Sequence, residues 1–154
     1  MRQPKIRDPF TFFKRHRAYG VVFLRFAMGV FLIYGVQDNV FSWERMLEFR
    51  DFLQAHEVPL PLLAAHLSVY TQFLIGLMLL LGWGVRIAGL LLVINFTAAI
   101  LIVHIGQSFP QYYPAAELIF AGFFYLFNGA GPLSVDSFLE RRQAQIQKQP
   151  VPVN

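Results

Sequence analysis

Three ionisable side chains, His66, His104 and Glu117, lie inside long apolar stretches of the sequence. Ionisable groups in such stretches mark candidate sites, because burying their charge in lipid is costly. With a helical rise of about 1.5 Å per residue, all three lie within about two turns of the same end of their stretches. Imidazole and carboxyl groups that meet there can exchange protons with a bound carbonyl or phenol. We therefore predict His104 and Glu117 as catalytic residues.

A quinone headgroup is the membrane-soluble ligand that best matches this chemistry, because it needs an apolar slot, aromatic walls and a few hydrogen-bond partners. We expect Gln37 and His66 to line the site and Tyr70 to supply an aromatic wall. The alternative is structural, with His104 and Glu117 only forming hydrogen bonds across helices.

A second polar layer lies about halfway along two of the apolar stretches, where Gln72 and Asn95 can pair side chain to side chain or contact the same ligand. No metal site is predicted, since two His and one carboxylate match a metal triad by type but no local spacing supports one. Haem held by His66 and His104 would need these two residues on facing helices with a cavity between them. The expected cofactor is therefore none of the chain's own, with a bound quinone as the ligand.

The composition points to lipid as the surrounding medium. Of the 154 residues, 56% are apolar and 14% are charged, whereas an average soluble domain carries about 25% charged residues. The same composition excludes disorder, which requires low hydrophobicity. With 0 cysteines in the whole chain, disulfides, thiol redox chemistry and cysteine-ligated metal centres are excluded as well.

A bilayer core needs about 20 mostly apolar residues per helix. Four stretches approach that length, at about residues 19–36, 60–81, 85–105 and 114–130. Pro114 fits the first turn of the last stretch, where its missing N–H needs no partner. With short links between them, these spans predict an all-α integral membrane protein, an antiparallel bundle of four transmembrane helices.

Ten of the 13 Lys and Arg residues lie before the first span, between the second and third spans, or after the fourth. Basic loops stay on the cytoplasmic side, so both termini are predicted to be cytoplasmic. The net charge of +4 follows mainly from this asymmetry; it suits anionic membrane lipid and gives no support to nucleic acid as a partner. Residues 1–18 and 140–154 are predicted to be flexible tails around a transmembrane domain of residues 19–139.

The loop between the first two spans is predicted to contain an amphipathic helix at about residues 42–56. Its apolar arc holds Trp43, Met46, Leu47, Phe49 and Leu53. Its acidic arc holds Glu44, Glu48 and Asp51. Such a helix would lie along the outer interface and cover the mouth of the bundle. The alternative is a docking surface for a periplasmic partner.

Arg25 interrupts the first span at the depth of the cytoplasmic leaflet. It can extend to the interface or pair with an acid. After the fourth span, residues 129–132 break the helix and Asp136 returns to the level of Arg25. We predict a structural ion pair between Arg25 and Asp136 that pins this C-terminal turn to the first helix.

Several short motifs occur together in an order typical of one family. They are Arg25, Gly29 and Gly35 in the first span, Leu79-Leu80-Leu81-Gly82 before Arg86, then His104, Glu117, and Gly131-Pro132-Leu133-Ser134-Val135-Asp136. With these motifs the chain resembles the DoxX family from about Val21 to Leu139. The resemblance implies a small multi-pass protein of the bacterial inner membrane. The superfamily that this resemblance implies includes the small DoxD subunit of thiosulfate:quinone oxidoreductase and members associated with thiol-oxidant detoxification complexes.

Two positions depart from the pattern of that family. Gln72 stands where the family often has Glu, and Asp38 stands where a basic residue is common. The first departure removes a charge that would support proton chemistry at mid-membrane, and the second reverses the charge at the outer mouth.

These features together predict an accessory subunit of a membrane redox assembly that binds a quinone, or a similar small apolar ligand, at its periplasmic mouth. A partner protein would supply the redox centre, so any enzymatic activity would be that of a subunit of a quinone-linked oxidoreductase. One alternative is a non-enzymatic membrane scaffold that recruits its partner through the helix at residues 42–56. Another alternative is a small-solute carrier. Four spans and no broken helix argue against a carrier, although a homo-oligomer would supply more spans.

Overall fold

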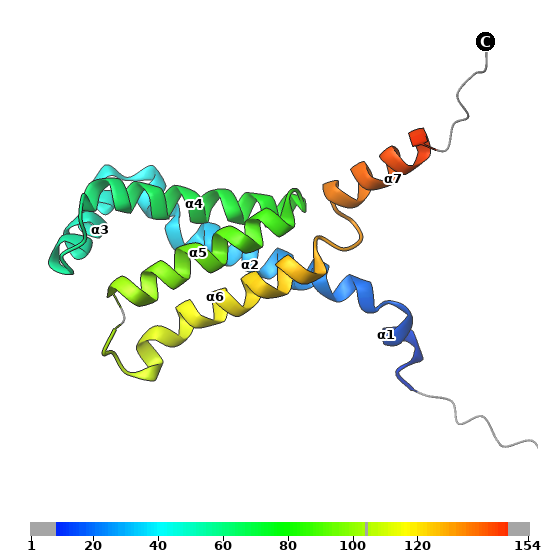
Figure 1. Cartoon of the computed structure of the whole chain (residues 1–154), viewed down its shortest axis with the longest axis horizontal. Coiled ribbons are helices and arrows are strands. Elements are labelled where there is room, and N and C mark those ends of the chain that lie inside the picture. Colours follow the sequence, from blue (N-terminus) through cyan, green and yellow to red (C-terminus); the bar gives the residue numbers. More distant parts are fainter. Residues whose placement is uncertain (1–8, 104, 148–154) are drawn as a thin grey trace, which may run out of the picture.

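A computed structural model describes residues 9–103 and 105–147 (Figure 1). Its elements are α1 (Thr11–Arg15), η1 (Arg17–Tyr19), α2 (Gly20–Phe41), α3 (Trp43–Ala55), α4 (Pro61–Leu81), α5 (Val85–Val103), α6 (Phe109–Asn128) and α7 (Val135–Gln147). The described residues include no strand. The predicted all-α fold class is therefore confirmed.

Three helices are long and apolar enough to cross a bilayer: Arg17–Phe41, which includes α2, and then α4 and α5. The chain is accordingly a multi-pass membrane protein. The fourth predicted span corresponds to α6, which is 20 residues long but is not one of these three. A count of four spans and the cytoplasmic position of both termini stay predictions.

The start of α6 differs from the expected one. The side chain of Ser108 and that of Gln111 satisfy each other's backbone N–H groups in a capping box, so the helix begins at Phe109. Pro110 occupies the first turn, and Pro114 lies inside the helix. The prediction that Pro114 starts this helix is therefore wrong, because capping by polar side chains outweighs the proline signal.

Two pairs of helices cross with their backbones in contact. A Cβ atom added to Gly29 in α2 would lie 3.0 Å from the carbonyl oxygen of Gly76 in α4, and the reverse distance is also 3.0 Å. In α5 and α6, a Cβ on Gly89 would lie 2.6 Å from the Gly122 oxygen, and one on Gly122 would lie 2.8 Å from the Gly89 oxygen. Small residues allow such close crossings in membranes. The bundle is thus built from two tight pairs, α2 with α4 and α5 with α6.

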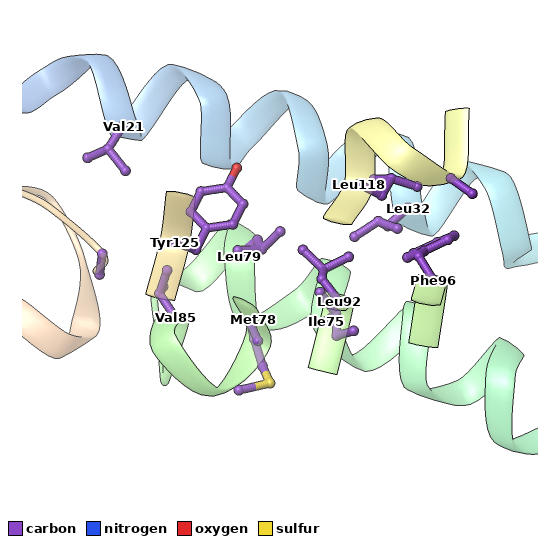
Figure 2. Close-up of a cluster of buried hydrophobic side chains, with 13 residues drawn as sticks. Val21, Leu32, Ile75, Met78, Leu79, Val85, Leu92, Phe96, Leu118 and Tyr125 are labelled. Atoms are coloured by element: carbon purple, nitrogen blue, oxygen red, sulfur yellow. The ribbon is translucent and has the colours of Figure 1, made fainter. Parts of the chain in front are cut away.

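Apolar side chains fill part of the seam between these two pairs. Figure 2 shows Leu79 of α4, Leu92 of α5 and Tyr125 of α6 turned toward one another, with the Tyr125 hydroxyl pointing toward α2. All three side chains are completely buried. This packing fixes how far each helix is rotated about its own axis.

A tight cluster of turns, which we name the closed end, joins the helices where α4 turns into α5. Arg25, only 3% exposed, donates hydrogen bonds to the carbonyl oxygens of Ala130 at 2.5 Å and Leu133 at 2.9 Å. Asp136 accepts from the N–H groups of Gly84 at 2.7 Å and Val85 at 3.0 Å. These bonds satisfy carbonyls outside helices and the free N–H groups at the start of α5.

The structure records no ion pair between the described side chains of Arg25 and Asp136. Each side chain bonds instead to backbone groups. Arg25 donates to the carbonyl oxygens of Ala130 and Leu133, and Asp136 accepts from the N–H groups of Gly84 and Val85. This arrangement replaces the predicted ion pair. It still fixes the C-terminal turn to the bundle. The backbone groups of this turn have no partners within a helix, so they take up the hydrogen-bonding capacity of both side chains.

Candidate functional site

At the opposite end of the bundle, which we name the open end, the two helix pairs part around a cavity of about 360 Å³. The residues that line this first cavity come from α3, α4 and α5 and from the segment between α3 and α4; Figure 1 shows how these three helices are arranged. Aromatic side chains line it from α3 and α5, namely Phe49, Phe52 and Phe96. Small residues leave the space open, with Ala64 on α4 and Ala98 and Ala99 on α5. Its size falls within the range of about 300–1,000 Å³ that is typical of small-molecule sites.

Two side-chain amides face this otherwise apolar space. Gln72 of α4 and Asn95 of α5 both line the first cavity. The Nε2 atom of Gln72 donates to Ser68 Oγ at 3.0 Å, whereas Asn95 Nδ2 is buried and finds no partner among the residues that the structure describes. The predicted pairing of the two amides is therefore replaced by a bond within α4. A buried donor without a partner costs free energy, so Asn95 Nδ2 is a candidate to bind a hydrogen-bond acceptor of a ligand.

The helix α3 covers the first cavity, as its amphipathic pattern indicates. Its cap is Ser42, whose side chain accepts from the N–H of Arg45. Met46 and Leu53 are buried against α2 and α4. Their burial directs Phe49 and Phe52 toward the cavity.

The acidic face of α3 is engaged by basic residues of the same region. Arg45 pairs with Glu48 at 2.7 Å, and Arg50 pairs with Asp51 at 2.5 Å. The hydrogen bond and charge of Glu48 raise the pKa of Arg45. Two of the three acidic side chains proposed for partner docking thus already have partners on their own helix.

His66 lies outside the first cavity, on the outer face of α4. Its ring centroid is 5.8 Å from that of Trp43 and 5.8 Å from that of Tyr70. Its Nδ1 lies 2.7 Å from the carbonyl oxygen of Leu62, one turn earlier. His66 and Tyr70 line a shallow groove of about 340 Å³ on this face. Gln37 is half-buried on α2 and is not among the residues that line the three cavities described here.

Glu117 is exposed and accepts a hydrogen bond from the hydroxyl of Tyr113. Ala115 and Leu118, on either side of it, are the residues that face the core, and at about 100° per residue Glu117 then points outward. The prediction that Glu117 and His66 converge on one inward-facing mouth is therefore wrong, since they lie on different outer faces. His104 lies outside the described residues. Within the described ranges no group of three potential ligands could hold a metal ion.

A second cavity of about 330 Å³ lies on the other side of the bundle, between α2 and α6. Gln72 and Phe96 line it as well as the first cavity.

Sequence reasoning missed Phe96 and Ser68 as site residues. The signal for them was the run of small residues near Ala98, which leaves room for a ligand between packed helices.

The model of the DoxX family matches residues 20–105, more than half of the chain. This range runs from the start of α2 to the end of α5 and includes every residue that lines the first cavity. Searches of curated proteins and of solved structures found no match. The chain belongs to the DoxX family.

Proposed function

We propose that this protein binds a small apolar molecule with a carbonyl acceptor in the first cavity, as an accessory subunit of a membrane redox assembly. A quinone headgroup is the chemical class that fits best. The observation that carries this proposal is the buried Nδ2 donor of Asn95, without a partner in the described structure, in an otherwise apolar cavity.

The lining of the cavity supports a flat, ring-shaped ligand. Phe49, Phe52 and Phe96 offer ring faces and edges for stacking. Asn95 would donate to one carbonyl oxygen of the ligand, and the amide oxygen of Gln72 would accept from a hydroxyl after reduction. Both redox forms of a quinone can therefore find a hydrogen bond in the same space.

A partner protein would supply the electrons, because the chain contains 0 cysteines and hence no thiol of its own. Any enzymatic activity is then that of the assembly. In this proposal the protein lies in the bacterial inner membrane with the open end toward the periplasm. His104 remains a proton partner in the proposal, whereas Glu117 is left out because no described residue of α6 lines the first cavity.

The scaffold alternative depends on the acidic face of α3. Glu48 and Asp51 are already paired with Arg45 and Arg50, so this face offers little free charge to a partner. We therefore favour ligand binding.

Replacing Asn95 with Leu tests the proposal, because the two side chains are nearly equal in size. Loss of the donor should weaken binding of a short-chain benzoquinone about tenfold, as expected for one hydrogen bond. The melting temperature should not fall, because the donor has no protein partner to lose. Titration calorimetry and thermal unfolding in one detergent measure the two quantities.

Asn128→Leu is the matched control, since Asn128 is exposed at the end of α6 and bonds only to Phe124 of its own helix. It should bind as the unchanged protein does. Equal binding by Asn95→Leu would refute the proposed site, and a lower melting temperature would show that Asn95 is a structural residue instead.

A further inference from the structure

The two cavities lie on opposite sides of one seam, the space between the α2–α4 pair and the α5–α6 pair. Each pair is locked at its own glycine crossing, Gly29 with Gly76 and Gly89 with Gly122. Toward the closed end, buried side chains such as Leu79 and Leu92 fill the seam (Figure 2). Toward the open end, the seam holds the first cavity on one side and the second on the other.

Among the described residues, two side chains line both cavities, Gln72 from α4 and Phe96 from α5. Phe96 is 9% exposed and is held by apolar contacts. Gln72 is bonded to Ser68, one turn earlier on its own helix. Because Gln72 is held by a bond within its own helix, rotation about its side-chain bonds is enough to part it from Phe96, which stays in the apolar cluster.

The second cavity differs chemically from the first. Its walls from α2 and α6 are apolar, with Phe31, Leu32 and Leu118. Gln111 also lines it, but its amide oxygen already accepts from the N–H and the hydroxyl of Ser108. The surface of the second cavity is mainly apolar, and no described residue that lines it has a buried polar side-chain atom without a partner, as Asn95 has in the first cavity.

We propose that the second cavity holds the apolar chain of the ligand whose ring occupies the first, with the ligand passing between Gln72 and Phe96. This inference rests on the proposed function and adds to it. It assigns the ligand class as a ring with a hydrocarbon tail, and it gives the two cavities one joint role. A molecule of that shape would contact both helix pairs toward the open end, where side chains such as Leu32 and Leu118 fill the seam only in part.

Gly35→Leu should place a side chain in the second cavity while leaving both glycine crossings in place. Gly35 lines that cavity, and a Cβ added to it would meet nothing within 4 Å. Gly20→Leu is the matched control, because Gly20 lies on the same helix, is equally open and lines neither cavity. Gly35→Ala is a smaller change at the same site and should give a smaller effect.

Two probes separate the ring from the chain: 2,3-dimethoxy-5-methyl-1,4-benzoquinone, and the same ring carrying a decyl chain. The unchanged protein should bind the decyl compound at least about tenfold more tightly, the gain expected from burying a few methylene groups. Gly35→Leu should remove most of this gain and leave the affinity for the bare ring unchanged. Gly20→Leu should change neither. Using one detergent throughout makes the partition of each probe into micelles the same for every variant, so the comparison between variants holds for each probe.

An intact chain-length gain in Gly35→Leu would overturn the inference, and so would an equal loss for both probes. The proposed function fails in a different way, namely if the bare ring does not bind or if Asn95→Leu leaves its binding unchanged. The two ideas can thus fail separately.

Discussion

The closed end and the open end of the bundle treat polar groups in opposite ways (Figure 1). At the closed end, Arg25 and Asp136 bond to four backbone groups that no helix satisfies. At the open end, Asn95 presents a buried donor to an apolar cavity without a partner in the described chain. The contrast separates side chains that hold the fold from a side chain that is available to a ligand.

A missing partner alone does not mark a binding site. Arg25 Nε and the Tyr125 hydroxyl are also buried without a partner among the described residues, yet neither residue lines any of the three cavities. Asn95 differs because space adjoins it. An orphaned donor and a cavity together indicate binding, whereas an orphaned donor in packed surroundings indicates a cost of packing.

Arg25→Met should have the largest effect on this comparison. It removes both bonds to the carbonyls of Ala130 and Leu133 and leaves those oxygens without donors. The expected loss of stability is about 3–5 kcal/mol, as for one partner removed from a buried charged interaction. The melting temperature in detergent measures it, and Arg25→Lys should recover part of the loss. A change of less than a few degrees for Arg25→Met would contradict a structural role for the closed end.

Gly89→Ala should have the next largest effect, because its Cβ would lie 2.6 Å from the Gly122 carbonyl oxygen. The α5–α6 pair would have to separate, at a cost of about 1–3 kcal/mol. Gly35→Ala is the control, since nothing lies within 4 Å of its added Cβ, and it should stabilise α2 slightly. If both variants melt at the same temperature, the two-pair description of the bundle is wrong.

The closed end was predictable from sequence because its signals are local. Arg25, the turn glycines and the segment that ends in Asp136 occur at fixed positions relative to helix ends. Depth along a helix follows from the rise per residue, so the level of each polar residue could be estimated as well. The sequence did not show that Arg25 and Asp136 bond to backbone groups and not to each other. Which backbone N–H and C=O groups of a turn lack partners is known only from the structure of that turn.

The open end could not be predicted in the same way, because the rotation of a helix about its axis depends on its neighbours. Contact of Gly89 with Gly122 turns Ala115 and Leu118 inward and Glu117 outward. A count of residues gives the height of Glu117 and says nothing about that choice. The family match supports membrane location and fold, and the cavity itself comes from the packing.

The smallest effect on stability and the most direct test of the central claim come from Ala98→Phe, which fills the first cavity from an exposed position of α5. Ala27→Phe, at an exposed position of α2 that lines neither cavity, is the control. The three proteins should have equal melting temperatures. Mass spectrometry of lipid extracts from the purified proteins should find a quinone with the unchanged protein and with Ala27→Phe. It should find little with Ala98→Phe. Equal amounts in all three extracts, or none in any, would contradict the account.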